Sequence, residues 1–214
     1  MNLYLEDICE ALGKKWPDNK TLNIVCHGHS VPAGYFATPF VNTFESYPHL
    51  LHRDLKEKFP FAVINVIVTA IGGENSTSGL ARFERDVLNH NPKIVTIDYA
   101  LNDMSIGVDK AKKNITGMIE KCLLKEIKVI LLTPSLDQFY FLNEENRNKL
   151  ERQAEMIRAL SLSFKVALAD SLAVMLKHIN CDGEISQLLS HVNHPNALGH
   201  KMIAAELGKL FLAK

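Results

Sequence analysis

The sequence has little that would direct it to a nucleic acid or a membrane. Its 214 residues hold 24 Lys and Arg against 24 Asp and Glu, so the formal net charge is zero. A surface without a dominant sign of charge has no field that attracts nucleic acid or anionic lipid. No apolar run approaches the roughly 20 residues of a membrane-spanning helix. The opening MNLYLEDICEALGKKW carries acidic side chains where a signal peptide needs a basic start and an unbroken apolar core. We therefore expect no nucleic-acid partner, no membrane span and a cytoplasmic location.

Cysteine is also sparse. The chain has four, at widely separated positions and without a C-x-x-C pair: Cys9, Cys26, Cys122 and Cys181. Cys26 and Cys122 lie in or beside apolar segments, where a cysteine acts as a small buried hydrophobic residue. The pattern predicts reduced thiols rather than a disulfide framework.

The composition itself is that of an ordinary globular protein, with 47% hydrophobic and 22% charged residues. A chain of this size buries about 70% of its unfolded surface on folding. The sequence shows no repeat, low-complexity segment or interdomain linker. We expect a single domain over residues 1–214.

Apolar, β-branched runs alternate with segments of helical period. The apolar runs are nearly continuous, as in strands buried on both faces of a parallel sheet, and they occupy residues 22–26, 61–70, 93–100, 128–134 and, more weakly, 165–170. The helical segments are 79–90, 111–126, 146–163 and 196–212. This alternation predicts an α/β fold of three layers with about five parallel strands.

Candidate functional residues follow the strands, where ligands bind in open α/β sheets. Ser30 follows the first strand, Gly72 and Gly73 the second, and Asn102 with Asp103 the third, whereas His194 precedes Pro195 and the last helix. These are the groups that acyl transfer needs: a serine, an imidazole to take its proton, and donors for an oxyanion. Each signal alone is as well explained by a turn or a cap.

Two other interpretations stay open at this point. The histidines of His27-x-His29 and His191-x-x-His194, with Asp103, are possible metal ligands. A non-catalytic binding module is the other, because a fold alone does not give a function. A phosphate or nucleotide binder has less support, since neither a P-loop motif nor a strand-linked G-x-G-x-x-G occurs.

Taken together, four blocks resemble those of the SGNH (GDSL-like) hydrolases. They are GHS at 28–30, IGGENS at 71–76, ALND at 100–103 and HVNHP at 191–195, so the match spans nearly the whole chain. The resemblance implies a flavodoxin-like α/β/α fold with strand order 2-1-3-4-5. It also implies an esterase with Ser30 as nucleophile and His194 as general base and acid. The oxyanion hole would be the backbone N–H groups of Ser30 and Gly73, preferred here over Gly72, with the Asn102 side chain.

The resemblance implies no metal and no organic cofactor, and a small-molecule ester as substrate. It leaves open which ester, because the family acts on lipids, acylated sugars, thioesters and other esters. Loops 31–44 and 136–146 carry aromatic side chains at the same end of the sheet. They would either wall an acyl or alcohol pocket or pack over neighbouring helices.

This chain departs from the family pattern at three positions. His29 replaces the aspartate of G-D-S, Ala100 replaces the glycine of G-x-N-D, and His191 replaces the aspartate that orients the base. An imidazole cannot hold the base in its tautomer as a buried carboxylate does. We therefore expect a Ser–His dyad whose histidine is oriented by a backbone carbonyl in 191–193 or by water. The other candidates are the carboxylates of Asp170, Asp182 and Glu184.

Overall fold

The protein is built on a five-stranded sheet with the strand order β2-β1-β3-β4-β5. The computed structural model describes residues 3–181 and 183–211. All neighbouring strands of this sheet run parallel. The strand number, direction and order confirm the prediction. The strands are β1 (Thr21–Gly28), β2 (Val63–Val68), β3 (Ile94–Asp98), β4 (Lys128–Leu132) and β5 (Ala167–Ala169).

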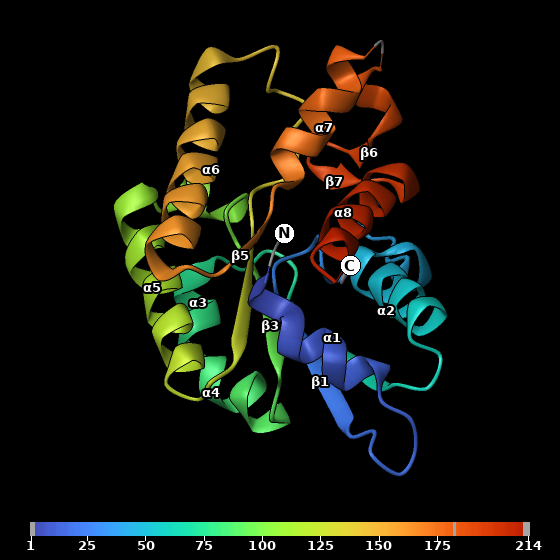
Figure 1. Ribbon diagram of the computed structural model, residues 1–214. Coiled ribbons are helices and arrows are strands. Elements are labelled where there is room, and N and C mark those ends of the chain that lie inside the picture. The colour runs from blue at the N-terminus through green and yellow to red at the C-terminus, as the bar shows by residue number, and fades with distance from the viewer. Residues whose placement is uncertain (1–2, 182, 212–214) are drawn as a thin grey trace.

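Helices cover both faces of the sheet and complete three layers (Figure 1). One face carries α1 (Glu6–Gly13), α2 (Tyr47–Lys58), α7 (Ser171–Asn180) and α8 (Ala197–Lys209). The other carries α3 (Ser76–Ala81), α4 (Phe83–Asp86), α5 (Val108–Leu123) and α6 (Glu144–Phe164). Short 3-10 helices are η1 (Leu3–Leu5), η2 (Thr43–Glu45), η3 (Leu88–His90), η4 (Asn102–Ser105) and η5 (Ile185–Gln187). Among the described residues, no helix is both long and apolar enough to cross a membrane.

The sheet divides the core into two clusters. In β1, Ile24 and Cys26 face one cluster and Val25 faces the other, and all three are fully buried. Such two-sided burial explains why β1, β3 and β4 appear in the sequence as continuous apolar runs. The β2 run is different, because β2 lies at the sheet edge and leaves Val63 45% and Val68 42% exposed.

The predicted helix over residues 79–90 is wrong in its continuity. The segment is divided into α3, α4 and η3, although Phe83, Val87 and Leu88 are buried as their spacing predicts. The first break falls at Arg82, whose backbone leaves the helical conformation with φ −102° and ψ 3°. Its guanidinium turns inward, where it donates to the carbonyl oxygen of Thr69 and to Glu74.

The carboxyl ends of the neighbouring strands β1 and β3 lie side by side at one end of the sheet. Gly28 pairs with Asp98 there, and a Cβ on Gly28 would lie 2.4 Å from the Asp98 carbonyl oxygen, so the close approach requires glycine. Near the C-terminus, the strand β6 (Leu189–His191) pairs antiparallel with β7 (His194–Pro195). Directly after β7, Asn196 caps α8 by accepting from the Leu198 and Gly199 N–H groups.

Candidate active site

Ser30 occupies a tight turn directly after β1. The turn is closed by hydrogen bonds from Tyr35 N to Ser30 O at 3.0 Å and from Gly34 N to Val31 O at 2.9 Å. Ser30 is only 7% exposed. The turn therefore fixes the backbone that carries the hydroxyl, and little water surrounds the hydroxyl. Ser30 lies at the carboxyl ends of the strands, where the sequence predicted the site.

The structure brings His194 from the other end of the chain to this hydroxyl. The His194 Nε2 atom lies 2.9 Å from Ser30 Oγ, and its Nδ1 atom lies 2.7 Å from the main-chain carbonyl oxygen of Phe36. A carbonyl oxygen can only accept, so Nδ1 carries the proton and Nε2 accepts from the serine. This is the tautomer that a general base for Ser30 needs.

The group that contacts Nδ1 of His194 is a backbone carbonyl, but not one of those expected. Phe36 follows the Ser30 turn, whereas the expected carbonyl lay in 191–193. The physical reason is the hairpin of β6 and β7. In it His191 and His194 are paired across the two strands, so the 191–193 main chain does not reach Nδ1 of the His194 ring. Loop 31–42 instead covers the Nδ1 side of the ring. No signal in the sequence distinguishes the Phe36 carbonyl from other loop carbonyls.

The two candidate carboxylates that the structure describes serve other groups. Asp170 pairs with Arg158 at 2.7 Å and caps α7 by accepting from Ala173 N. Glu184 is the N-cap of η5 and forms a capping box with Gln187. Asp182 lies outside the described residues.

The pKa of His194 is lowered from its ordinary value of 6.5. Desolvation is the largest cause, and repulsion from His29 and His191 adds to it. The hydrogen bond to the Phe36 carbonyl acts in the opposite direction. Since a lower pKa keeps the imidazole neutral, His194 is able to accept a proton at neutral pH.

The glycine and asparagine loops also meet at this edge. Asn102 donates its Nδ2 to the Glu74 carbonyl oxygen at 2.8 Å, which links the loop after β3 to the loop after β2. Gly73 has a positive φ of 81°, and apart from its chain neighbours no described residue lies within 4 Å of where its Cβ would be. The next residue, Asp103, accepts from Ser76 N at 2.7 Å, so it ties the loop after β3 to the start of α3. Burial raises the pKa of Asp103 to about 6.

His29 is a second imidazole beside the serine, considered above only as a possible metal ligand. Its Nδ1 atom lies 3.4 Å from Ser30 Oγ and accepts from Val31 N at 3.3 Å, while Nε2 lies 3.5 Å from the Asp98 carboxylate. His27 points elsewhere, toward Thr69 and Gly79, and burial lowers its pKa to about 4. Across residues 3–181 and 183–211, no group of three or more His, Cys, Asp or Glu is arranged to hold a metal ion.

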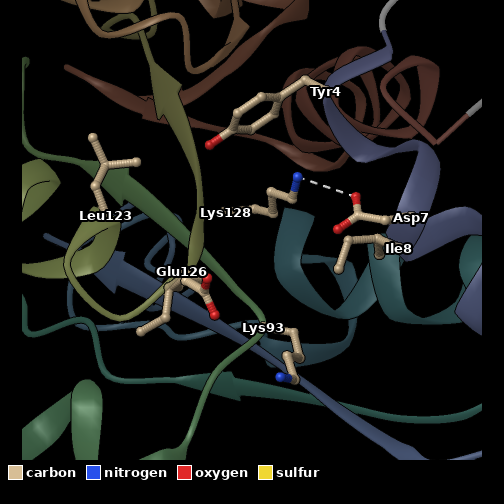
Figure 2. A pocket seen from close by; sticks show the side chains of 8 residues that line it. Tyr4, Asp7, Ile8, Lys93, Leu123, Glu126 and Lys128 are labelled. Atoms are coloured by element: carbon tan, nitrogen blue, oxygen red, sulfur yellow. Dashed lines mark ion pairs between the residues drawn. The ribbon is translucent and has the colours of Figure 1, made fainter.

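A separate cavity of about 500 Å³ lies at the opposite edge of the sheet. Figure 2 shows Lys128 reaching toward Asp7, with which it forms an ion pair of 3.1 Å. Lys93 directly precedes β3 and Lys128 begins β4, so this cavity lies at the amino ends of the parallel strands. It is distinct from the site at Ser30.

Comparison with solved structures shows the same fold in several hydrolases. LAE5, an alpha/beta hydrolase enzyme from the metagenome of Lake Arreo, Spain, is 18% identical with a TM-score of 0.79, over 89% of this chain and 94% of that chain. Axe2, an acetylxylan esterase from Geobacillus stearothermophilus, is 17% identical with a TM-score of 0.78, over 90% and 95%. Its catalytic mutants replace a serine, a histidine and an aspartate.

A two-domain esterase active on acetylated mannans has a TM-score of 0.79 at 20% identity, over 99% of this chain and 53% of that chain. No curated protein is significantly similar in sequence. The family model for the GDSL-like lipase/acylhydrolase family, in contrast, matches residues 26–202. That match runs from β1 into α8 and covers most of the sequence. The chain therefore belongs to the GDSL-like lipase/acylhydrolase family, whose members are hydrolases acting on ester bonds.

Proposed function

We propose that the protein is a serine esterase that cleaves a carboxylic ester through an acyl-enzyme on Ser30, with His194 as general base and then general acid. The observation that carries this proposal is the 2.9 Å contact between Ser30 Oγ and His194 Nε2. The Phe36 carbonyl oxygen, 2.7 Å from Nδ1, supports the required tautomer. The family's activity on ester bonds gives the reaction class.

In acylation, Ser30 Oγ forms a bond to the ester carbonyl carbon while its proton passes to His194 Nε2. The carbonyl electron pair moves to oxygen, and the oxyanion is held by the Ser30 and Gly73 backbone N–H groups and the Asn102 amide. Collapse of the intermediate then breaks the bond to the alcohol oxygen. His194 gives its proton to that oxygen, so the alcohol leaves neutral.

Deacylation repeats the same steps with water. His194 takes a proton from a water molecule as the water oxygen bonds to the acyl carbon. The intermediate collapses by breaking the bond to Ser30 Oγ, which recovers the proton from His194. The products are a carboxylic acid and the free serine.

A carbonyl at Nδ1 stabilises the protonated form of His194 differently from the carboxylate of a catalytic triad. The Phe36 carbonyl holds the ring and its tautomer through a hydrogen bond. As a neutral dipole, it stabilises the imidazolium less than a carboxylate would. The lowered pKa of His194 is consistent with this weaker support. We therefore infer a dyad in which the Phe36 carbonyl takes the position of the third member.

The test is a panel of 4-nitrophenyl esters from acetyl to octanoyl, hydrolysed by wild type, Ser30→Ala and His194→Ala. Acetyl esters come first because Axe2 and the mannan-active esterase act on acetylated carbohydrates. We expect at least one ester to be cleaved, and each variant to lose roughly a thousandfold or more in kcat. Inactivity of the wild type on the whole panel, or undiminished hydrolysis by Ser30→Ala, would contradict the proposal. A non-catalytic binding module predicts the first of these two results.

A further inference from the structure

A buried ion pair lies behind the loop that carries Gly73. We propose that the pair of Arg82 and Glu74 is a positioning device that sets two oxyanion donors, the Gly73 N–H and the Asn102 amide. This inference rests on the proposed function and deepens it. It concerns residues that neither touch the ester nor move a proton.

The pair is strong and shielded from water. Arg82 donates to Glu74 Oε2 from Nε at 2.9 Å and from its terminal nitrogen at 2.5 Å. The two side chains are only 8% and 15% exposed. Arg82 also donates to the Thr69 carbonyl oxygen at 2.6 Å, which ties the pair to the chain just after β2. A planar guanidinium held at several points has one orientation, so it fixes Glu74 in direction as well as in distance.

The main chain of Glu74 orients the Asn102 amide. Its carbonyl oxygen accepts one of the two Nδ2 protons of Asn102 at 2.8 Å. This bond decides which way the amide is turned, because an oxygen in place of Nδ2 would face the Glu74 carbonyl without a proton. The second Nδ2 proton is then fixed in the amide plane and free for an oxyanion. A displaced Glu74 would release the amide to rotate.

Gly73 depends on the same residue. Apart from its two chain neighbours, no described residue lies within 4 Å of where a Gly73 Cβ would be, so side-chain packing does not hold the loop at that point. Its position is set by its neighbours and by the turn that the Glu74 N–H closes on the Ile71 carbonyl oxygen at 3.3 Å. On one side Gly72 lies close to the Tyr35 ring, which would be 3.0 Å from a Cβ on this glycine. On the other side the Glu74 carboxylate accepts hydrogen bonds from Arg82. Loosening Glu74 therefore frees the Gly73 peptide as well.

This arrangement predicts a specific kinetic signature. Donors aimed at an oxyanion act on the transition state, so their misplacement lowers kcat and changes KM little. Loss of one donor costs roughly 100- to 1,000-fold, and donors that are only misplaced cost less, about 10- to 100-fold. The acid limb of the pH profile, which reports His194, should not move.

The experiment compares Glu74→Gln and Arg82→Lys with Asp86→Asn as the matched control. Asp86 is the other anionic partner of the same guanidinium, at 3.3 Å, and it does not touch the loop. We expect kcat to fall about 10- to 100-fold in both test variants with KM within about threefold, and the control to stay within about threefold of wild type. Arg82→Lys keeps the positive charge but loses the planar guanidinium that donates to Glu74 from two nitrogens. It therefore remains informative if Glu74→Gln fails to fold.

A second readout is independent of turnover. In wild type, the Asn102 side-chain amide proton bonded to Glu74 should exchange slowly by NMR, and the test variants should exchange it faster whereas Asp86→Asn should not. Wild-type kcat with unchanged exchange in the test variants would overturn the inference, and so would equal losses in the control. An inactive wild type, or an active Ser30→Ala, would instead overturn the proposed function, and the amide exchange would still test the Arg82–Glu74 inference.

Discussion

The Nδ1 atom of His194 lies 2.7 Å from the carbonyl oxygen of Phe36, a residue 158 positions away in the chain. This contact stands where the family resemblance led us to look for a carboxylate, and where this chain has His191 instead. A main-chain carbonyl cannot be lost by a side-chain substitution. The orientation of His194 consequently depends on the fold of loop 31–42 rather than on one acidic residue.

The first prediction follows from that contact. Asp170→Asn and Glu184→Gln should leave kcat within about threefold of wild type, because neither carboxylate supports His194. Loss of the orienting aspartate in a triad lowers kcat by about 10⁴-fold. Asp170→Asn should lower Tm, since it removes the charge that pairs with Arg158. A loss of kcat in either variant comparable to that of His194→Ala would show that a carboxylate orients the base after all.

The second prediction concerns the pH dependence of the base. Because the pKa of His194 is lowered, the acid limb of the kcat/KM profile should have its midpoint below pH 6.5, the ordinary pKa of histidine. His191 contributes to the lowering by repulsion. His191→Asp replaces that repulsion with attraction for the imidazolium, so it should move the acid limb to higher pH and reduce activity in acid.

His191→Gln is the matched control, because it removes the repulsion without adding a negative charge. It should move the limb in the same direction by a smaller amount. A limb that stays in place or moves to lower pH in His191→Asp would contradict this account of the base. We expect kcat at its plateau to change only a few-fold, since the Phe36 carbonyl still occupies Nδ1.

The third prediction separates the two glycines of the loop after β2. Gly73→Ala places a side chain at φ 81°, which costs about 1 kcal/mol of strain and rotates the peptide that carries the proposed donor. We expect kcat to fall tenfold or more. Gly72→Ala instead meets the Tyr35 ring at 3.0 Å, and the double variant with Tyr35→Ala should recover what that contact costs. Equal recovery of Gly73→Ala by Tyr35→Ala would argue against this division of roles.

The fourth prediction concerns stability and His200, which is fully buried and stacks on the Phe36 ring at 5.0 Å. Its Nδ1 accepts from Tyr47 N at 3.2 Å, so the ring is neutral, and burial lowers its pKa to about 3. Between pH 6.5 and about 3 the unfolded chain binds a proton here that the folded chain does not. Stability from this group is therefore lost as pH falls, at about 1.4 kcal/mol per pH unit.

The measurement for His200 is Tm from pH 7 to pH 4, compared with His200→Asn. Asparagine keeps an acceptor near the Nδ1 position and does not titrate, so its Tm should fall less steeply in acid even if its Tm at pH 7 is lower. His27, whose pKa burial lowers to about 4, adds a slope of the same sign. Asp103, with its pKa raised to about 6, opposes them between its unfolded value and pH 6. Parallel curves for wild type and His200→Asn would contradict the assignment.

Much of this architecture is predictable from sequence because the determinants are local. The apolar runs of β1, β3 and β4 are continuous since both faces are buried, and Ser30, Gly73 and Asn102 follow strands whose carboxyl ends share an edge. The break at Arg82 is different, because its guanidinium binds Glu74 and Thr69, and hydrophobic periodicity gives no sign of these polar contacts. The Phe36 carbonyl is a group that every residue carries, so only the folded loop reveals it.

The central claim is that Ser30 carries the acyl group, and the most direct measurement is the mass of the trapped intermediate. Wild type is mixed with a cleavable ester, quenched in acid within its first turnovers, and mapped by peptide mass spectrometry, with a fluorophosphonate as the irreversible equivalent. We predict one adduct, on the peptide that contains Ser30, absent in Ser30→Ala and formed much more slowly in His194→Ala. An adduct on another residue, or ester hydrolysis and labelling that persist in Ser30→Ala, would contradict the account.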